Sequence, residues 1–428
     1  MNTLATSFPR SVGLQASNRL AAVAKTAVCR LLTHIHGAHL TLTDDDSVES
    51  FGDPESSVKG EMTVTDSSAY LDILLRGGIG AAEAYVDGKW HSSNLTAVIQ
   101  VFAINIGTID RIQSGISSLL GQFNRALHWW NRNTRSGAKR NIRSHYDLSN
   151  ELFSRLLDKR MMYSSAIYPD PESTLDEASE YKLRRICDKL QLCADDHLLE
   201  IGTGWGGLAI FAASEYGCRV TTTTISQEQF DYAQAEIQRH GLADRIELVF
   251  KDYRELAGAQ TFDKIVSVEM IEAVGHRYYP VFFDHCARLL KDDGLMLMQA
   301  ILIADHRYQD AIRKVDFIQR YIFPGSCIPS VSALTGAMRD ASDFRVVHLE
   351  DISADYATTL QQWRERLLAD RSHIASMAGF DEAFVRLWDF YFAYCEGGFR
   401  ERNISNAQII YARPRAKQDR LLGDRVQA

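Results

Sequence analysis

The chain has 428 residues, of which 46% are hydrophobic and 24% charged, and its formal net charge is −8. This length predicts one large and one small domain, and the acidic balance argues against a nucleic-acid-binding protein. Seven cysteines without a CxxC pair argue against a disulfide framework or a zinc site and favour a reducing compartment.

The first 43 residues contain no aspartate or glutamate. Residues 17–35 place apolar side chains at helical spacing together with Arg19, Lys25 and Arg30. Three interpretations fit: a transit peptide, an amphipathic helix on anionic lipid, or an ordinary first helix. Short strand and helix patterns follow, so we predict a small N-terminal α+β domain over 1–130 that associates with lipid or membrane.

A long helical pattern from about residue 97 ends in Trp129 and Trp130. The next stretch is basic, with no acid between Arg125 and Arg143, and is interpreted either as a solvated linker or as a surface that seeks lipid phosphates. No apolar run reaches the roughly 18–20 residues that cross a bilayer. We predict a basic linker over 131–150, a catalytic domain over 151–415 and a polar tail over 416–428.

The catalytic region alternates apolar strands with helices. The strands are expected at 197–202, 218–226, 246–253, 262–270 and 295–303, and helices at 178–192, 205–217, 227–241 and 278–294 separate most of them. Alternation of this kind predicts a parallel, doubly wound α/β sheet.

The first strand runs directly into the glycine-rich "EIGTGWGG" at 200–207. Glycines here allow a sharp turn and close approach of a ligand to the following helix. A dinucleotide dehydrogenase would need a ribose-binding acid at the end of the second strand, which instead reads "TTTTIS". The acid, Glu200, precedes the first glycine by two residues, the arrangement of S-adenosylmethionine (SAM)-dependent methyltransferases. Asp252 and Tyr253 after the third strand are placed to hold an adenine.

The catalytic part, residues ~140–412, resembles the cyclopropane-fatty-acyl-phospholipid synthase family, which includes the mycolic acid cyclopropane synthases. The similar stretches include "HYDLSNELF", "MMYSSAIY", "LLEIGTGWGG", "TTTISQEQ", "SVEMIEAVG", "RYIFPGSCIPS" and "CEGGFRERNI". The resemblance implies a Rossmann-like class I SAM-dependent methyltransferase fold. It also implies a set of cofactor-binding residues: Tyr163, Ser164, Glu200, Gly202, Gly204, Thr224, Ile225, Gln229, Asp252 and Tyr253.

The family's acceptor is the cis double bond of a phospholipid acyl chain, and a bound bicarbonate removes the proton after methyl transfer. The positions that correspond to its catalytic set are Glu272, Tyr356, Gln299, Ser165 and Ile301. Where the family has one Cys and two His, this chain has Ser165, Ala273 and Gln299. Serine and glutamine hydrogen-bond an anion but do not titrate near neutrality as histidine does. The resemblance therefore implies a cyclopropane product, with methylation without ring closure as the alternative.

Two other classes remain open: an NAD(P)-linked oxidoreductase, and a lipid-binding relative without turnover. His145 and Asp147 in "HYDLSN" are interpreted as a helix cap at the cofactor lid. His276 and His306 have no partners at metal-ligand spacing, so we predict no metal site. The resemblance implies a cytoplasmic homodimer, peripheral to the inner face of the membrane, that passes its product to a partner oxidoreductase if no ring is formed.

Overall fold

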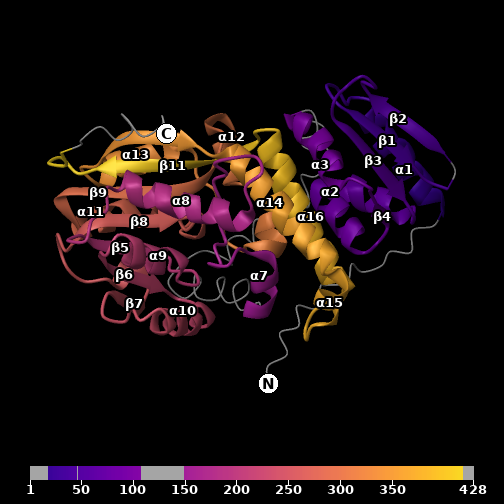
Figure 1. Cartoon of the computed structure of the whole chain (residues 1–428). Helices are drawn as coiled ribbons and strands as arrows, with labels where there is room; N and C mark the ends of the chain where they lie inside the picture. Colours follow the sequence, from indigo (N-terminus) through magenta and orange to yellow (C-terminus); the bar gives the residue numbers. More distant parts are fainter. Residues whose placement is uncertain (1–17, 46, 108–148, 418–428) are drawn as a thin grey trace. The chain divides into compact units, whose positions relative to one another are not determined.

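The computed structural model describes residues 18–45, 47–107 and 149–417, which form two compact units (Figure 1). Unit 1 comprises residues up to 127 together with 314–322 and 360–403, and unit 2 comprises 128–313, 323–359 and 404–428. The predicted boundary at 150 assigned 314–322 and 360–403 to the catalytic domain. Trp129, Trp130, His145, Asp147 and most of the predicted linker and tail lie outside the described residues.

Unit 1 contains a four-stranded sheet in the order β2-β1-β3-β4. Its strands are β1 (His39–Thr43), β2 (Val48–Gly52), β3 (Lys59–Val64) and β4 (Trp90–His91). Its helices are α1 (Asn18–Leu32), α2 (Ser68–Val86), α3 (Leu95–Ile104), α15 (Arg371–Ser376) and α16 (Glu382–Arg400), with the π-helical turn η4 (Ile318–Ile322) and the part of α14 (Ser353–Ala369) from Leu360 onward. Helix α16 contacts α2 and α3, which explains why a C-terminal segment belongs to the N-terminal unit.

Helix α1 is an integral part of unit 1. It packs against α2 and buries Ala21, Ala24 and Val28, while Lys25 pairs with Asp44 at 2.7 Å. These contacts are those of an ordinary first helix.

Unit 2 is built on a seven-stranded sheet in the order β10-β11-β9-β8-β5-β6-β7. The strands are β5 (His197–Ile201), β6 (Arg219–Thr224), β7 (Ile246–Phe250), β8 (Phe262–Val268), β9 (Leu290–Ile303), β10 (Arg345–Asp351) and β11 (Ile404–Ala412). The five strands expected from the sequence are present and parallel. The sheet is not wholly parallel, however, because β11 enters between β9 and β10 and runs antiparallel to both.

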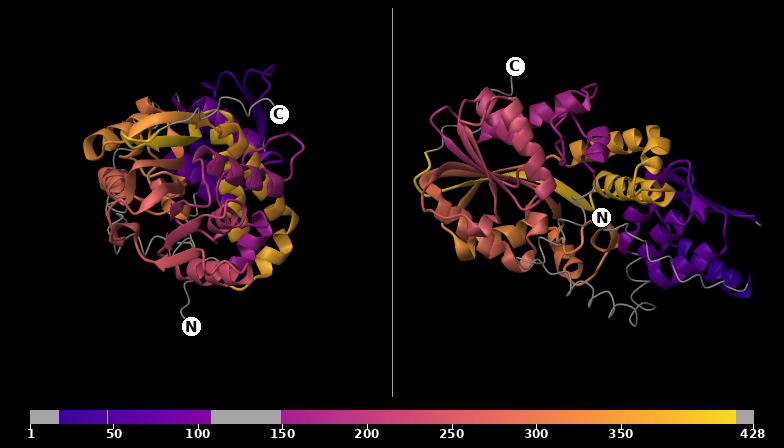
Figure 2. Two further views of the ribbon diagram at one scale, coloured as in Figure 1. Left: turned by 60° about the vertical axis from the view of Figure 1, so that its left-hand side comes forward. Right: turned by 90° about the horizontal axis from the view of Figure 1, so that it is seen from below.

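Helices cover both faces of this sheet, as the right-hand view of Figure 2 shows. The helices of unit 2 are α7 (Asn150–Leu156), α8 (Leu175–Lys189), α9 (Gly207–Glu215), α10 (Gln227–Arg239), α11 (Tyr279–Leu289), α12 (Asp305–Ala311) and α13 (Val331–Ala341), with the short turns η1 (Tyr253–Glu255), η2 (Ile271–Ala273) and η3 (His276–Tyr278). Successive strand residues point to opposite faces. Thus Leu198 packs in a core with α8 and α9, whereas Leu199 packs in a core with α11 and α13.

Local sequence explains where the principal helices begin. Thr174 and Glu177 form a reciprocal capping box at the start of α8, and Ser226 caps α10 by accepting a hydrogen bond from the Gln229 N–H. These caps fix the helix starts beside the carboxyl ends of the strands.

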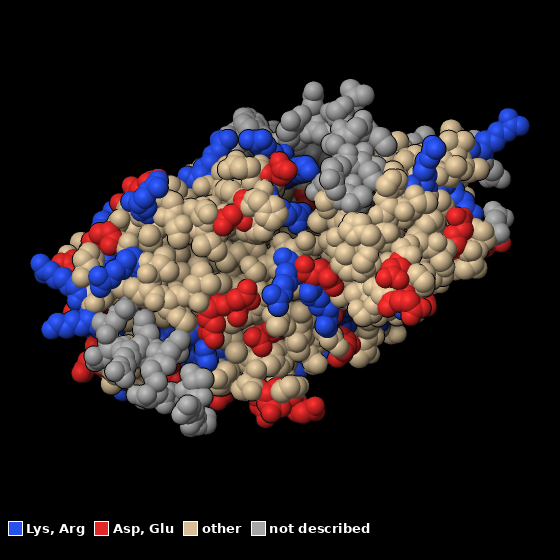
Figure 3. Space-filling view, turned by 90° about the horizontal axis from the view of Figure 1, so that it is seen from above, with Lys and Arg blue, Asp and Glu red and all other residues tan. Residues whose placement is uncertain are grey.

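No helix among the described residues is long and apolar enough to span a membrane. On the face of the molecule seen in Figure 3, basic and acidic side chains are interspersed.

Candidate active site

The strand order reverses between β5 and β8: the chain moves outward from β5 to β6 and β7, then returns to place β8 on the other side of β5. Ligands of open α/β sheets bind in the crevice at the carboxyl ends of strands flanking such a switch point. The glycine-rich turn follows β5, and the acids of "SVEMIEAVG" follow β8. The two motifs singled out in the sequence therefore meet at one place.

The turn after β5 has the backbone that the glycines predict. Gly202 has φ +100°, and a Cβ there would lie 3.3 Å from Met270 Cγ. Gly204 faces open space, since an added Cβ would meet no atom within 4 Å. The Thr203 hydroxyl is buried and has no hydrogen-bond partner among the described residues. An open, glycine-lined turn with an unpaired hydroxyl fits a bound cofactor.

The cofactor-binding acid Glu200 lies on β5, and the residues expected on the ribose side, Thr224, Ile225 and Gln229, lie at the end of β6 and the start of α10. Glu200 is buried and accepts a 2.6 Å hydrogen bond from the Thr222 hydroxyl, and burial raises its pKa to about 8. The Thr224 hydroxyl donates to Gln229 Oε1 at 2.9 Å, and Ile225 follows as a half-buried residue. Thr224 and Gln229 are thus brought together, whereas Glu200 is engaged within the sheet.

The two residues expected at the adenine differ in their surroundings. The Asp252 carboxylate accepts hydrogen bonds from the Arg254 backbone N–H at 3.0 Å and from Arg254 Nε at 2.8 Å. The Tyr253 ring packs edge-on against Phe282, and its buried hydroxyl has no partner in the described part of the chain. Asp252 is already paired with a cation, while Tyr253 keeps one free polar group.

The segment that carries Tyr163, Ser164 and Ser165 is held by buried polar groups. Lys182, on α8, is fully buried, and its Nζ donates to Ser164 Oγ at 2.7 Å. Burial lowers the pKa of Lys182 to about 8 against the attraction of Glu269 and Asp158, which raise it. The Tyr163 ring lies 5.2 Å from that of Phe153. The Ser165 hydroxyl donates to Ala166 O, so Ser165 meets the neighbouring site residues through its backbone: its N–H donates to Glu269 Oε1, and its carbonyl accepts from Gln299 Nε2 at 3.4 Å.

Those candidates converge on Glu269. Its Oε1 accepts hydrogen bonds from the Ser165 N–H at 3.0 Å, Gln299 Nε2 at 2.8 Å and Asn406 Nδ2 at 2.6 Å. Its Oε2 accepts one from the Tyr356 hydroxyl at 2.7 Å. The structure therefore brings three of the five predicted catalytic residues together around a carboxylate outside that set.

Glu272 and Ile301 form a separate pair. The Ile301 N–H donates to Glu272 Oε1 at 2.5 Å, while Glu272 Oε2 is buried and unpaired among the described residues. Burial raises the pKa of Glu272 to about 8, and the neighbouring charge of Glu269 acts in the same direction. Glu272 is thus adjacent to the cluster but does not organise it.

Sequence reasoning did not select Glu269, Asn406 or Lys182 for the site, although signals for them exist. Lys182 interrupts the apolar face of α8, where the neighbouring positions Ala178 and Ile186 are buried. Asn406 is a fully buried polar residue inside strand β11. A polar residue at a core position is a standard sign of a buried network.

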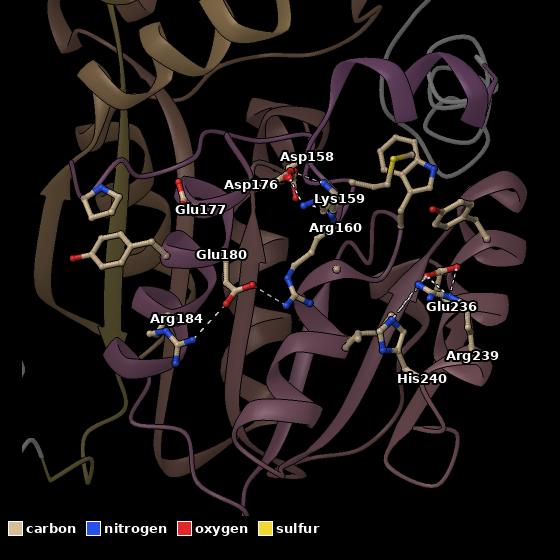
Figure 4. Close-up of a pocket in the computed structure, with 17 residues that line it drawn as sticks. Asp158, Lys159, Arg160, Asp176, Glu177, Glu180, Arg184, Glu236, Arg239 and His240 are labelled. Atoms are coloured by element: carbon tan, nitrogen blue, oxygen red, sulfur yellow. Dashed lines mark hydrogen bonds and ion pairs between the residues drawn. The ribbon is translucent and has the colours of Figure 1, made fainter. Parts of the chain in front are cut away.

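A cavity of about 590 Å³ lies on unit 2 beside α8, α9 and α10, and the end of the glycine-rich turn, Trp205 and Gly207, forms part of its lining (Figure 4). Figure 4 shows Glu180 between Arg160 and Arg184, and Glu236 paired with Arg239. These lining charges are paired with one another, and the cavity does not include Gly202, Gly204 or Glu269. We therefore place the active site at the switch point.

The raised pKa of Glu272 predicts a pH-dependent contribution to stability. Between pH 4.5 and about 8 the folded protein keeps a proton that the unfolded chain releases, so the free energy of unfolding falls as pH rises through this interval. Glu272→Gln keeps an oxygen for the Ile301 N–H but does not titrate. Relative to wild type, the variant should gain stability from pH 5 to 8 by on the order of a few kcal/mol. Calorimetric melting temperatures of both proteins from pH 5 to 8 test this prediction. If the melting temperatures of wild type and Glu272→Gln changed in parallel with pH, the prediction would be contradicted.

A seven-stranded sheet of this order, with a glycine-rich turn after β5 and a polar cluster at the switch point, defines a class I SAM-dependent methyltransferase. Comparison with known proteins agrees. The sequence pattern of the family described as mycolic acid cyclopropane synthetase matches residues 133–409. The chain belongs to this family.

Individual relatives cover most of the chain. It is 38% identical over 342 residues to the tuberculostearic acid methyltransferase UfaA1 of Mycobacterium tuberculosis, covering 76% of each chain. It is 34% identical over 362 residues to the cyclopropane-fatty-acyl-phospholipid synthase of Escherichia coli K12, covering 83% of this chain and 89% of the other. The mycolic acid cyclopropane synthase CmaA1, solved with SAH and CTAB, superposes with a TM-score of 0.59 at 27% identity, covering 64% of this chain and 98% of that one. The predicted fold class and enzyme class are confirmed.

Proposed function

We propose that this methyltransferase transfers the methyl group of SAM to the double bond of an unsaturated acyl chain in a membrane phospholipid. The observation that carries the proposal is the Glu269 carboxylate, fixed by four hydrogen-bond donors at the switch point. The names of the relatives, which include a cyclopropane-fatty-acyl-phospholipid synthase, support a lipid acceptor.

The chemistry of an alkene acceptor matches this arrangement. When bound, SAM supplies an electrophilic methyl group on a positively charged sulfur. An alkene carries no proton that must be removed before it attacks, so no base is required at that stage. Positive charge then develops on the acyl chain, and a preorganised carboxylate stabilises it without reorganising. Burial of the site in a low-dielectric surrounding strengthens that attraction.

The proposed SAM contacts come from four segments. Tyr163 and Ser164 close over the methionine part, and the Gly202–Gly204 turn passes beneath it. Thr224, Ile225 and Gln229 lie on the ribose side, and Glu200 precedes the turn by two residues. Asp252 and Tyr253 lie at the adenine, where the unpaired Tyr253 hydroxyl is the group available to a ligand.

The residues assigned to a bound bicarbonate do not fit that role here. Ser165, Gln299 and Tyr356 already donate to Glu269, and Glu272 lies beside them as a second carboxyl group. No step of the proposed reaction passes through bicarbonate.

We propose a cyclopropane as the product. A methylated chain without a ring is the second candidate, because the chain is 38% identical to a relative named tuberculostearic acid methyltransferase. In that case a partner oxidoreductase would reduce an unsaturated product. Since the acceptor resides in a bilayer, we propose a peripheral enzyme at the cytoplasmic membrane face, acting as a homodimer.

Incubation of the purified protein with SAM and vesicles of a cis-unsaturated phospholipid is expected to increase the acyl mass by one CH2 unit. Loss of the double bond in the product identifies a ring, and its retention identifies methylation. Mass spectrometry with double-bond-specific fragmentation measures both, and a fully saturated phospholipid serves as the control. Tight SAM binding without any mass increase on unsaturated phospholipids would overturn the proposed acceptor.

A further inference from the structure

The environment of Glu269 is that of a bound anion. Four donors from four separate segments point to its two oxygens: a backbone N–H at Ser165, two amide NH2 groups at Gln299 and Asn406, and the Tyr356 hydroxyl. Backbone N–H, amide and hydroxyl donors of these kinds are the groups that hold a small oxyanion in proteins. The carboxylate of Glu269 occupies the position that such an anion would take.

The backbone of Glu269 is strained in a way that places its side chain at this position. Glu269 has φ +48°, in the left-handed region that residues other than glycine rarely adopt. Its N–H donates to Gln299 O at 2.8 Å, which ties the strained residue to β9. Strain of this kind persists where the surrounding structure over-determines the conformation, and it is concentrated at functional sites.

A buried relay fixes the direction of the Gln299 amide. Lys189 donates to Gln408 Oε1, so the amide nitrogen of Gln408 faces Gln299 and donates to its Oε1 at 3.0 Å. The nitrogen of Gln299 must then face Glu269. Gln299 and Gln408 are fully buried, and the relay joins a cation at one end to the carboxylate at the other.

One position on Glu269 remains available for a proton. A carboxylate offers about four lone-pair directions. Oε1 accepts three hydrogen bonds, whereas Oε2 accepts one, from Tyr356, among the described residues. Oε2 can therefore accept a proton without losing the contacts that hold Oε1.

We propose that Glu269 takes the place of a bound bicarbonate as the proton acceptor of the reaction, which makes turnover independent of bicarbonate. This inference rests on the proposed function. The alkene π pair forms the bond to the methyl carbon as the S–CH3 bond breaks. The electron pair of a C–H bond on the resulting cation then forms the ring bond or a new double bond. The proton passes to Glu269 Oε2 and is later released to water.

Wild type and Glu269→Gly are compared with SAM and unsaturated phospholipid vesicles, in buffer freed of CO2 and in buffer with added bicarbonate. Wild-type rates should agree within twofold in the two buffers. Glycine tolerates the positive φ and leaves an anion-sized space, so the variant should lose at least 100-fold in rate without bicarbonate. Added bicarbonate or formate should raise the turnover rate of Glu269→Gly at least tenfold above its rate without either anion. Glu172→Gly, in an exposed turn, is the matched control and should behave as wild type.

A second measurement needs no turnover: formate or bicarbonate should raise the melting temperature of Glu269→Gly but not that of wild type. A wild type that depends on bicarbonate by more than tenfold, an undiminished Glu269→Gly, or a folded Glu269→Gly that neither anion rescues or stabilises would overturn the inference. If wild type yields no product on any unsaturated phospholipid while the anions still stabilise only the glycine variant, the proposed function fails and the assignment of the anion position stands.

Discussion

Replacing Gly207 by alanine is expected to weaken SAM binding at least tenfold and to lower the melting temperature by several degrees. Gly207 begins α9, and an added Cβ would lie 2.5 Å from Arg160 O and 2.7 Å from Met162 Sδ. Arg160 and Met162 lead directly into Tyr163–Ser165, so relief of the overlap must displace the segment that carries three proposed site residues. Overpacking of this kind costs about 1–3 kcal/mol. Isothermal titration with SAM and thermal unfolding measure the two effects.

Gly336→Ala provides the matched control. Gly336 lies in α13 of the same unit, and an added Cβ would meet nothing within 4 Å. Alanine in a helix interior is favoured over glycine by roughly 0.5–1 kcal/mol, so this variant should melt slightly higher and bind SAM as wild type does. If Gly207→Ala kept wild-type SAM affinity, the glycine turn could not position the 160–165 segment in the way described.

The fold was largely predictable because its core elements have strong local patterns. The buried strands of unit 2 are short apolar runs, and the helices between them carry local start signals: Gly206 before α9, the Ser226 cap of α10 and Pro280 in the first turn of α11. The antiparallel strand β11 was not predicted, since nothing local in "ISNAQIIYA" specifies its neighbours or its direction. The packing of α16 against α2 and α3 was missed for the same reason: it joins residues about 300 positions apart.

The site was only partly predictable. The sequence indicated the strand ends and, through the family resemblance, Glu272, but it did not select Glu269. The direction of a side chain after a strand depends on the backbone of that residue, and the positive φ of Glu269 cannot be inferred from periodicity. The relay through Gln408 is equally invisible, because it depends on the register of β11 against β9, which sets Gln408 opposite Gln299.

Replacing Lys182 by methionine is expected to weaken SAM binding roughly tenfold at pH 7 and, at high pH where Lys182 is neutral, to destabilise the protein by about 1–3 kcal/mol through the lost hydrogen bond to Ser164. Methionine fills a similar volume but removes a charge that attracts the carboxylates of Asp158, which is buried, and of Glu269, which is partly buried. Asp158 accepts hydrogen bonds from the backbone N–H groups of Arg160 and Met162. Removing the Lys182 charge therefore disturbs the same 160–165 segment that Gly207 contacts. Ser164 also loses the donor that orients its hydroxyl. Calorimetry and SAM titration measure both effects.

The pH dependence of stability and of SAM affinity distinguishes loss of the Lys182 charge from loss of its side-chain packing. Burial lowers the pKa of Lys182 from 10.5 to about 8, so above pH 8 the folded wild type has released a proton that the unfolded chain still holds. Wild-type stability should therefore gain a rising contribution between pH 8 and 10.5 that Lys182→Met lacks. The difference in SAM affinity between the two proteins should narrow over the same interval, as Lys182 becomes neutral. Lys159→Met, whose exposed side chain pairs with Asp176 at 3.0 Å, should show neither effect. A tenfold affinity difference that stayed constant from pH 7 to 10 would mean that the shape of Lys182, and not its charge, positions Ser164.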